Sequence, residues 1–393
     1  MEKRLRTPSP RLPPLVAKVN RPVPSGSTFF AAPKCSNADT VHWARATKCD
    51  IRKSLGGDLS VSVGEFVGRG DYYIAHSEGV GTLFIKALLF NQEDDNILRR
   101  ISGERLAGEL SLPSDGLFSP LISKNIVESC CYPGDYYVVS DFEENSDALS
   151  SSDPSISDVI VNKLGRFIYS LERISIPPRF AERKAADAVE MLYFLSRLDE
   201  AETLSSLARG GNEVLAIIRS EADLISELCS EVRGKSVRSG FSHGDLKLSQ
   251  LLQKKDGSIL VCDWEECGVA PAMNDLSFAA ADIFYSQIRR IVDDYLDHAE
   301  DQFSLQDIYD NAVGLAIDKI HHLVNGYVNA SGEALSQDEK RVFEIRLGLA
   351  GLFRLYTVSA KTNAPRPREL ALASIGMQVA AGQGIDILGV DRA

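Results

Sequence analysis

Between residues 59 and 140, hydrophobic positions fall in short runs, and in the first of these runs Leu59, Val61 and Val63 alternate with polar residues. A period of two is typical of half-buried strands. The expected strands cover 59–63, 72–75, 82–88, 125–128 and 136–140. Between the third and fourth runs the period lengthens and predicts a helix over about 94–110. Five antiparallel strands and one helix predict a small, strand-rich lobe.

The pattern changes after Asp141. A polar, Ser-rich stretch at 145–157 predicts a hinge, and beyond it the apolar positions recur at helical spacing. The expected helices cover about 157–173, 180–208, 211–232, 274–298, 304–330, 337–360 and 367–382. Short strands at 251–252 and 259–262 interrupt them. This order predicts an α+β, bilobal fold, with a small antiparallel N-lobe and a large, mainly helical C-lobe.

The first 40 residues show no apolar periodicity. They hold seven prolines, and seven Lys or Arg against two acids, so we expect a flexible basic arm. A helix over about 41–55 should follow it. The expected domains are therefore the arm at 1–40, the N-lobe at 41–143 and the C-lobe at 144–393.

Composition narrows the function classes. Of the 393 residues, 44% are hydrophobic and 25% charged, which allows a substantial core. The net charge of −12 disfavours general binding to nucleic acid. No run of eighteen uncharged apolar residues and no apolar leader are present, so neither a membrane span nor a secretory signal is expected. The seven cysteines form no Cys-x-x-Cys pair, which favours a reduced cytoplasmic protein.

The candidate chemistry centres on the loop His243-Gly244-Asp245-Leu246-Lys247-Leu248-Ser249-Gln250, with Asp263 thirteen residues after it. Two carboxylates at this distance suit phosphoryl transfer, because one can contact an acceptor hydroxyl while the other holds a metal on the phosphates. The stretch resembles the catalytic loop and metal-binding strand of the aminoglycoside phosphotransferase and choline kinase-like family, which has a protein-kinase-like fold. That family carries Asn where this chain has Gln250.

The resemblance implies a role for each member of the catalytic loop, residues 243–250. Asp245 would orient the acceptor hydroxyl, and His243 would support the loop. Lys247 would neutralise charge on the transferred phosphoryl group, or else pair with a nearby carboxylate. Gln250 offers the same amide oxygen as Asn on a longer side chain, so it is expected to bind Mg²⁺ together with Asp263. The alternative is a degenerate site that no longer catalyses transfer.

The N-lobe is expected to bind ATP. Lys86 would reach the phosphates, with Glu104 as its acidic partner and Glu109 as the competing choice. A glycine turn at Gly68 and Gly70 would cradle phosphate with its backbone amides. The segment Asp141-Phe142-Glu143 would lie near the adenine. In the C-lobe, Asp275 would cap the next helix and brace the catalytic loop.

These expectations describe a kinase that uses ATP and Mg²⁺ to phosphorylate a hydroxyl of a small molecule, such as an amino sugar, an amino alcohol or an antibiotic. One alternative acceptor is a Ser or Thr side chain of a precursor peptide. In lanthipeptide-type pathways, stand-alone kinases of this fold work with a partner lyase that eliminates the phosphate. A second alternative is a pseudokinase that acts as a scaffold or nucleotide sensor. The sequence leaves the acceptor open.

Overall fold

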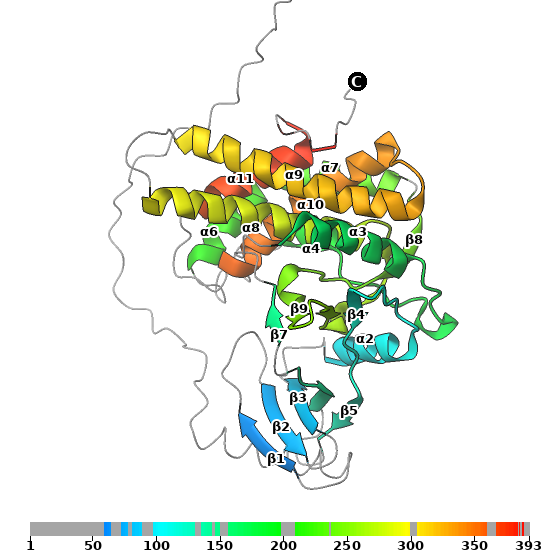
Figure 1. The fold of residues 1–393 in the computed structure, drawn as a ribbon. Coiled ribbons are helices and arrows are strands. Elements are labelled where there is room, and N and C mark those ends of the chain that lie inside the picture. The colour runs from blue at the N-terminus through cyan, green and yellow to red at the C-terminus, as the bar shows by residue number, and fades with distance from the viewer. Residues whose placement is uncertain are drawn as a thin grey trace, which may run out of the picture.

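The computed structural model describes residues 59–63, 72–77, 81–88, 97–129, 135–143, 146–149, 156–197, 209–235, 237–298, 305–359, 367–383, 385 and 387–388. The basic arm, the helix expected at 41–55 and the glycine turn with Gly68 and Gly70 lie outside these residues. The expected α+β, kinase-like fold is confirmed. Figure 1 shows a sheet at one end of the molecule and a group of long helices at the other.

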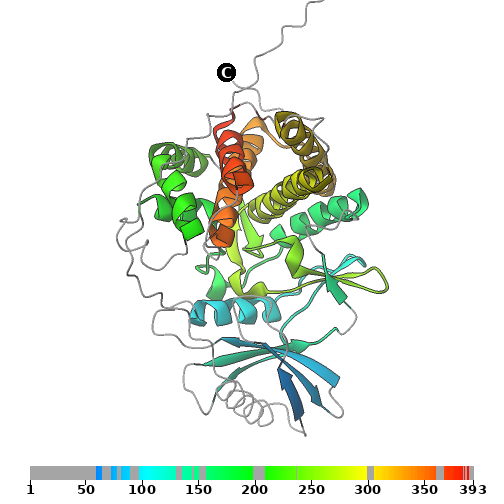
Figure 2. The same cartoon turned by 90° about the vertical axis from the view of Figure 1, so that its left-hand side faces the viewer.

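The sheet of the small lobe is antiparallel, with the strand order β1-β2-β3-β6-β5. Its strands are β1 Leu59–Val63, β2 Tyr72–Ser77, β3 Gly81–Leu88, β5 Asn125–Glu128 and β6 Tyr136–Asp141. All five overlap the short runs that the sequence predicts as strands. Helix α2, Ile97–Glu109, crosses between this sheet and the large lobe in both Figures 1 and 2. Leu88, Ile97, Ile101 and Val138 form the apolar contact between α2 and the sheet.

The large lobe packs around one extended hydrophobic core. Its helices are α3 Asp158–Glu172, α4 Ala188–Arg197, α6 Arg209–Ser220, α7 Ala222–Gly234, α8 Asn274–His298, α9 Leu305–Ser331, α10 Gln337–Ser359 and α11 Pro367–Ala381. Two glycines let α3 and α9 approach backbone to backbone. A Cβ on Gly165 would lie 2.0 Å from the Leu323 carbonyl oxygen, and one on Gly326 would lie 1.8 Å from that of Asn162.

Two small sheets carry the segments that the sequence marked for chemistry. In the first, the strand order is β4-β10-β9-β7, with β4 Phe118–Pro120, β7 Ser146–Ala148, β9 Leu251–Lys254 and β10 Ile259–Val261. In the second, β8 Ser239–Ser242 pairs with β11 Gly268–Pro271. The catalytic loop therefore leaves one small sheet at β8 and enters the other at β9.

Three sequence-based expectations need correction here. The helix expected over 180–208 begins only at Ala188, because residues 181–187 form turns and an isolated bridge between Lys184 and Val269. The Ser-rich stretch at 145–157 is not simply a hinge, because Ser146–Ala148 forms β7 and pairs with β9 beside the catalytic loop. The single helix expected over 211–232 is divided at Glu221 into α6 and α7. Alternation could not reveal β7, because three polar and small residues form a strand there through backbone pairing alone.

Candidate active site

The catalytic loop turns sharply at Gly244, which has a φ of 88°. A Cβ at this position would lie 2.2 Å from the carbonyl oxygen of Glu266, so only glycine fits. The close approach brings the loop against the segment that follows Asp263. Gly244 therefore sets where Asp245 lies relative to the second carboxylate.

A buried carboxylate braces the start of this loop. Asp275, at the beginning of α8, accepts hydrogen bonds from Ser242 Oγ at 2.8 Å, His243 N at 2.6 Å and Gly244 N at 2.9 Å. Burial raises the pKa of Asp275, while the N–H and hydroxyl donors act in the opposite direction by favouring its charged form. This geometry matches the bracing expected for Asp275.

The ring of His243 is also part of the support. It is fully buried, lies 4.6 Å from the Trp264 ring between centroids, and its Nε2 is 2.9 Å from the carbonyl oxygen of Cys262. Because Cys262 directly precedes Asp263, this contact ties the catalytic loop to the strand that carries the second carboxylate. The ring makes no contact with Asp245 among the contacts described for these residues, which agrees with a supporting position.

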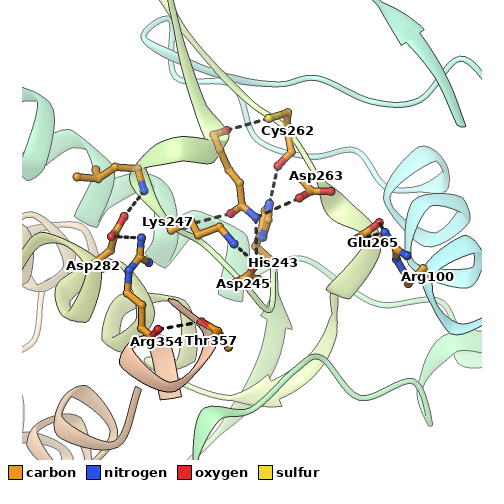
Figure 3. Close-up of polar contacts among 12 residues, drawn as sticks. Arg100, His243, Asp245, Lys247, Cys262, Asp263, Glu265, Asp282, Arg354 and Thr357 are labelled. Carbon is orange, nitrogen blue, oxygen red and sulfur yellow. Dashed lines mark hydrogen bonds and ion pairs between the residues drawn. The ribbon is translucent and has the colours of Figure 1, made fainter. Parts of the chain in front are cut away.

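Gln250 connects the two carboxylates. Its amide nitrogen lies 3.2 Å from Asp245 Oδ2 and 3.3 Å from Asp263 Oδ2, while its Oε1 accepts the Lys247 N–H at 3.2 Å. Lys247 Nζ lies 2.5 Å from Asp245 Oδ2. Lys247 is therefore paired with a carboxylate, the second of its two expected arrangements. Figure 3 shows Lys247, Asp245 and His243 grouped at the loop and Asp263 facing them.

Asp263 is itself in a special conformation. Its backbone is left-handed, with φ 70° and ψ 55°, which is uncommon for a residue other than glycine. Lys86 Nζ bonds to Asp263 Oδ1 at 2.6 Å and to Glu265 Oε2 at 2.7 Å, and Arg100 bonds to Glu265 at 2.8 Å. We call Lys86, Arg100, Asp263 and Glu265 the Lys86 cluster. It joins β3 and α2 of the small-lobe side to the segment after β10.

The pKa shifts in the Lys86 cluster follow from these pairs. Burial alone would raise the pKa of Asp263, but the adjacent Lys86 ammonium lowers it to about 2. Burial alone would lower the pKa of Lys86, but the charges of Asp263 and Glu265 raise it above its usual value. Both groups are therefore charged at neutral pH, as a lysine that binds phosphate and a carboxylate that binds metal must be.

Glu104 differs from the arrangement expected for it. Lys86 bonds to Asp263 and Glu265, and among the hydrogen bonds of the described residues none joins it to Glu104. Glu104 is only 5% exposed, and burial followed by the charge of Asp263 raises its pKa to about 7. Glu109, the competing choice, is paired with Arg179 on the surface. Sequence spacing predicted Glu104 as the partner of Lys86, but it could not predict that Glu265 forms the ion pair with the Lys86 ammonium instead.

The chemistry of the donor set fits a hard cation. Carboxylate and amide oxygens are the ligands that Mg²⁺ prefers. Here the Lys86 ammonium bonds to Asp263 Oδ1 and the Gln250 amide nitrogen bonds to Asp263 Oδ2. Positive groups thus gather where a cation would bind. The amide of Gln250 presents nitrogen rather than oxygen to this space, so it would have to rotate to act as a ligand. No ready-made cluster of three or more His, Cys, Asp or Glu residues suited to a metal exists within the described part of the chain.

The sequence model of the phosphotransferase enzyme family matches residues 128–309, a segment that contains the catalytic loop, Asp263 and Asp275. Over these residues, which make up slightly less than half of the chain, the sequence is similar to that family. The expected resemblance is thereby confirmed, and the protein is a kinase that transfers a phosphoryl group to a hydroxyl acceptor. No curated protein matches the chain in sequence.

Solved structures support the same fold for the phosphotransferase. An amicoumacin kinase in complex with AMP-PNP, Ca²⁺ and Ami is 12% identical, with a TM-score of 0.53, and the match covers 90% of this chain and 99% of that one. A choline kinase from Streptococcus pneumoniae is 14% identical, with a TM-score of 0.50 and coverage of 87% and 99%. A choline/ethanolamine kinase family protein from Mesorhizobium loti is 12% identical, with a TM-score of 0.50 and coverage of 87% and 94%.

The segment expected near the adenine forms the end of β6 and the connection to β7. Asp141 is ion-paired with Lys124, Phe142 N donates to the Thr82 carbonyl at 3.1 Å, and Glu143 lies 3.9 Å from Lys254. Residues 141–143 therefore lie between the small-lobe sheet and β9 in the phosphotransferase. Its contact with adenine remains a prediction.

Sequence reasoning missed three supporting side chains. Arg183 donates to the carbonyl oxygens of Cys267, Arg99 and Glu265 at 2.7, 2.6 and 2.8 Å, and so joins α2 to the segment after Asp263. Asp282 and Arg354 form an ion pair beside the catalytic loop. Asp282 could have been found, because it lies seven residues after Asp275 and therefore on the same face of α8. Arg183 and Arg354 belong to no motif. Within the described residues, no helix has the length and apolar character needed to cross a membrane.

Proposed function

We propose that this phosphotransferase uses ATP with Mg²⁺ and phosphorylates a hydroxyl of a small molecule, such as an amino sugar, an amino alcohol or an antibiotic. The observation that carries the proposal is the shared amide of Gln250, which contacts both Asp245 and Asp263 while Lys86 contacts Asp263. The acceptor-orienting group, the metal-binding group and the phosphate-binding group are thereby linked in one network. Amicoumacin kinase and choline kinase, both similar in fold, are named for small-molecule acceptors, which supports this class of acceptor.

In the proposed reaction, Asp245 accepts the hydrogen bond of the acceptor hydroxyl and so aligns its oxygen with the terminal phosphorus of ATP. A bond forms between that oxygen and the phosphorus, the bond from the phosphorus to the β-phosphate oxygen breaks, and the hydroxyl proton passes to Asp245. Lys86 leaves its carboxylate partners to bind the phosphates. Asp263 and the amide oxygen of Gln250 would hold Mg²⁺, which neutralises phosphate charge when bound.

The position of Lys247 suggests a second electrostatic contribution. Its ammonium bonds to Asp245 and its side chain is 31% exposed, so it can also reach a charged group that approaches this carboxylate. We expect it to balance negative charge as the phosphoryl group passes to the acceptor.

The substitution Asp245→Asn tests the proposal. It keeps the shape of the side chain but removes the proton acceptor, so kcat should fall about 10²- to 10⁴-fold. Binding of ATP with Mg²⁺, measured by calorimetry, should change little, because Asp245 contacts the acceptor rather than the nucleotide. Asp147→Asn, on the exposed part of β7, is the matched control and should keep full turnover.

The acceptors for this experiment are aminoglycosides, amino alcohols and candidate precursor peptides, each followed by mass spectrometry for addition of phosphate. Transfer to small molecules supports the proposal, while transfer to Ser or Thr of a peptide alone would replace it with the peptide kinase. Binding of ATP without transfer or hydrolysis would favour the pseudokinase. Equal turnover by Asp245→Asn and the wild type would remove Asp245 from its proposed role.

A further inference from the structure

A second buried carboxylate of α8 holds the far end of the catalytic loop. Asp282 has no exposed surface, and its Oδ2 accepts the N–H of Leu248 at 2.6 Å. Leu248 begins the 3-10 turn Leu248–Gln250, which carries the amide shared by the two carboxylates. Asp275 binds the first residues of the loop, so the two acids anchor both of its ends to one helix.

The charge that balances Asp282 comes from a different helix. Its Oδ1 accepts a bond from Ser286 Oγ at 3.3 Å and forms an ion pair with Arg354 Nη2. A buried carboxylate is costly unless a cation and hydrogen bonds compensate it. Among the ion pairs of the described residues, Arg354 is the cation that contacts Asp282. The ionised state of this second anchor therefore depends on α10.

Arg354 lies outside the segment that matches the family, which ends at residue 309. It projects from α10 toward Asp282, and Figure 3 shows Asp282 between Arg354 and the catalytic loop. The Arg354 side chain is 30% exposed, whereas Asp282 is fully buried. The pair therefore connects α10, which lies beyond the matched segment, to the Leu248–Gln250 turn. Lys247 directly precedes this turn.

We infer that Asp282 and Arg354 are a positioning pair for phosphoryl transfer, which fixes the Leu248–Gln250 turn and thereby the distances among Asp245, Gln250 and Asp263. Neither residue needs to touch a substrate for this effect. The inference rests on the proposed function, because it concerns the geometry of the same site. Helix α10 thus contributes to the geometry of the active site as well as to packing.

The main test compares Arg354→Gln with Arg354→Lys. Loss of the cation should allow the turn to shift and lower kcat about 10- to 100-fold, with the KM for ATP and for the acceptor within about twofold of wild type. Arg354→Lys retains the charge and should recover most of the turnover. In the double variant Arg354→Gln/Asp282→Asn, the loss should not exceed that of the worse single variant, because both changes remove the same interaction.

Arg341→Gln is the matched control. Arg341 also lies on α10, thirteen residues before Arg354, and pairs with Glu231 at 2.9 Å. None of its described bonds joins it to the catalytic loop. It should keep the wild-type kcat. An equal loss of kcat in Arg341→Gln would show that any damage to α10 lowers turnover and would overturn the positioning pair. A higher KM for the acceptor with unchanged kcat in Arg354→Gln would also overturn it, because Arg354 would then be a binding residue.

Amide hydrogen exchange at Leu248 separates this inference from the proposed function. The Leu248 N–H should exchange faster in Arg354→Gln than in wild type or in Arg341→Gln, whether or not the protein transfers phosphate. If the wild type shows no turnover, the proposed function fails while the exchange still tests the anchor. If the wild type is active but Arg354→Gln keeps its kcat and its Leu248 protection, the positioning pair is wrong and the proposed function stands.

Discussion

The catalytic loop and the Lys86 cluster meet at Asp263, but they are held in different ways. Asp275 and Asp282 hold the loop through backbone N–H groups, and both carboxylates are at most 1% exposed. The Lys86 cluster consists of ion pairs between side chains that are 14–32% exposed. The loop is therefore fixed by bonds that no ligand can reach, while the bonds of the Lys86 cluster lie where phosphate and metal can exchange with them.

This difference suits phosphoryl transfer. The carboxylate that orients the acceptor must keep its position through the reaction, since small displacements cost large factors in rate. In the proposed reaction, Lys86 and Asp263 bind the nucleotide and its metal, so they must instead be charged, accessible and able to change partners. Lys86 and Asp263 neutralise each other in a half-buried place.

The largest effect on stability is expected from Asp275→Ala. Removal of this carboxylate leaves the buried His243 N–H and the Ser242 hydroxyl without their acceptor, and it leaves the Gly244 N–H with only Ser242 Oγ at 3.1 Å. Each unsatisfied group costs about 1–3 kcal/mol, so the free energy of unfolding should fall by about 3–5 kcal/mol. Denaturant unfolding measures the change, and the exposed Asp147→Ala should alter it by less than about 0.5 kcal/mol. A loss below about 1 kcal/mol in Asp275→Ala would mean that the brace is not important for stability.

A smaller effect, which depends on pH, is expected from Glu104→Gln. Burial raises the pKa of Glu104 from 4.5 to about 7, so between these values the folded protein keeps a proton that the unfolded chain releases. Glu104 therefore makes the fold less stable as the pH rises from about 4.5 to about 7, by roughly 3 kcal/mol in total. Glutamine cannot ionise, so the variant should lose this part of the pH dependence and gain stability relative to wild type at pH 8.

Chemical unfolding at several pH values between 4 and 8 checks this expectation. Glu109→Gln is the control on the same helix, because Glu109 is exposed and paired with Arg179 at the surface. It should leave the pH dependence of stability unchanged. If wild type and Glu104→Gln respond to pH in parallel, Glu104 is charged in the fold at neutral pH. Glu104 would then be available to pair with Lys86, and it would have to be counted as a charged member of the Lys86 cluster.

The sequence predicted the loop better than the Lys86 cluster, for a physical reason. Asp245, Gln250, Asp263 and Asp275 lie on short, locally determined segments, so their spacing in sequence nearly determines their spacing in space. The strands of the small lobe were equally predictable, because each lies on a short, largely apolar run that polar or turn residues separate from the next. The family resemblance and the hydrophobic pattern together indicated how the β9–β10 hairpin and the start of α8 are arranged.

Partners that come from distant elements could not be predicted. Lys86 lies 177 residues before Asp263 and 179 before Glu265, and its choice between Glu265 and Glu104 depends on how α2 packs against the segment after β10. That packing is set by Gly103, where a Cβ would lie 2.2 Å from the carbonyl oxygen of Glu265. Arg354 contacts Asp282, and through it the loop, from α10, which lies more than 70 residues after Asp282 in the sequence. Such contacts appear only once the fold is known.

The smallest of the three effects is expected from Glu265→Gln, which removes one acceptor from the Lys86 cluster. Lys86 keeps Asp263, and Arg100 is partly exposed at 21%, so water can replace part of what is lost. The free energy of unfolding should fall by about 1–2 kcal/mol, as for hydrogen bonds to charged groups, and less in 1 M salt, where the Debye length is about 3 Å. Denaturant unfolding at low and high salt measures both values. A loss as large as that of Asp275→Ala, and insensitive to salt, would show that the Lys86 cluster is a rigid support like the loop rather than a set of exchangeable pairs. Separation of Lys86 from Asp263 would then require a large free energy. Nucleotide binding would have to move β3 and α2 together with Lys86 and Arg100.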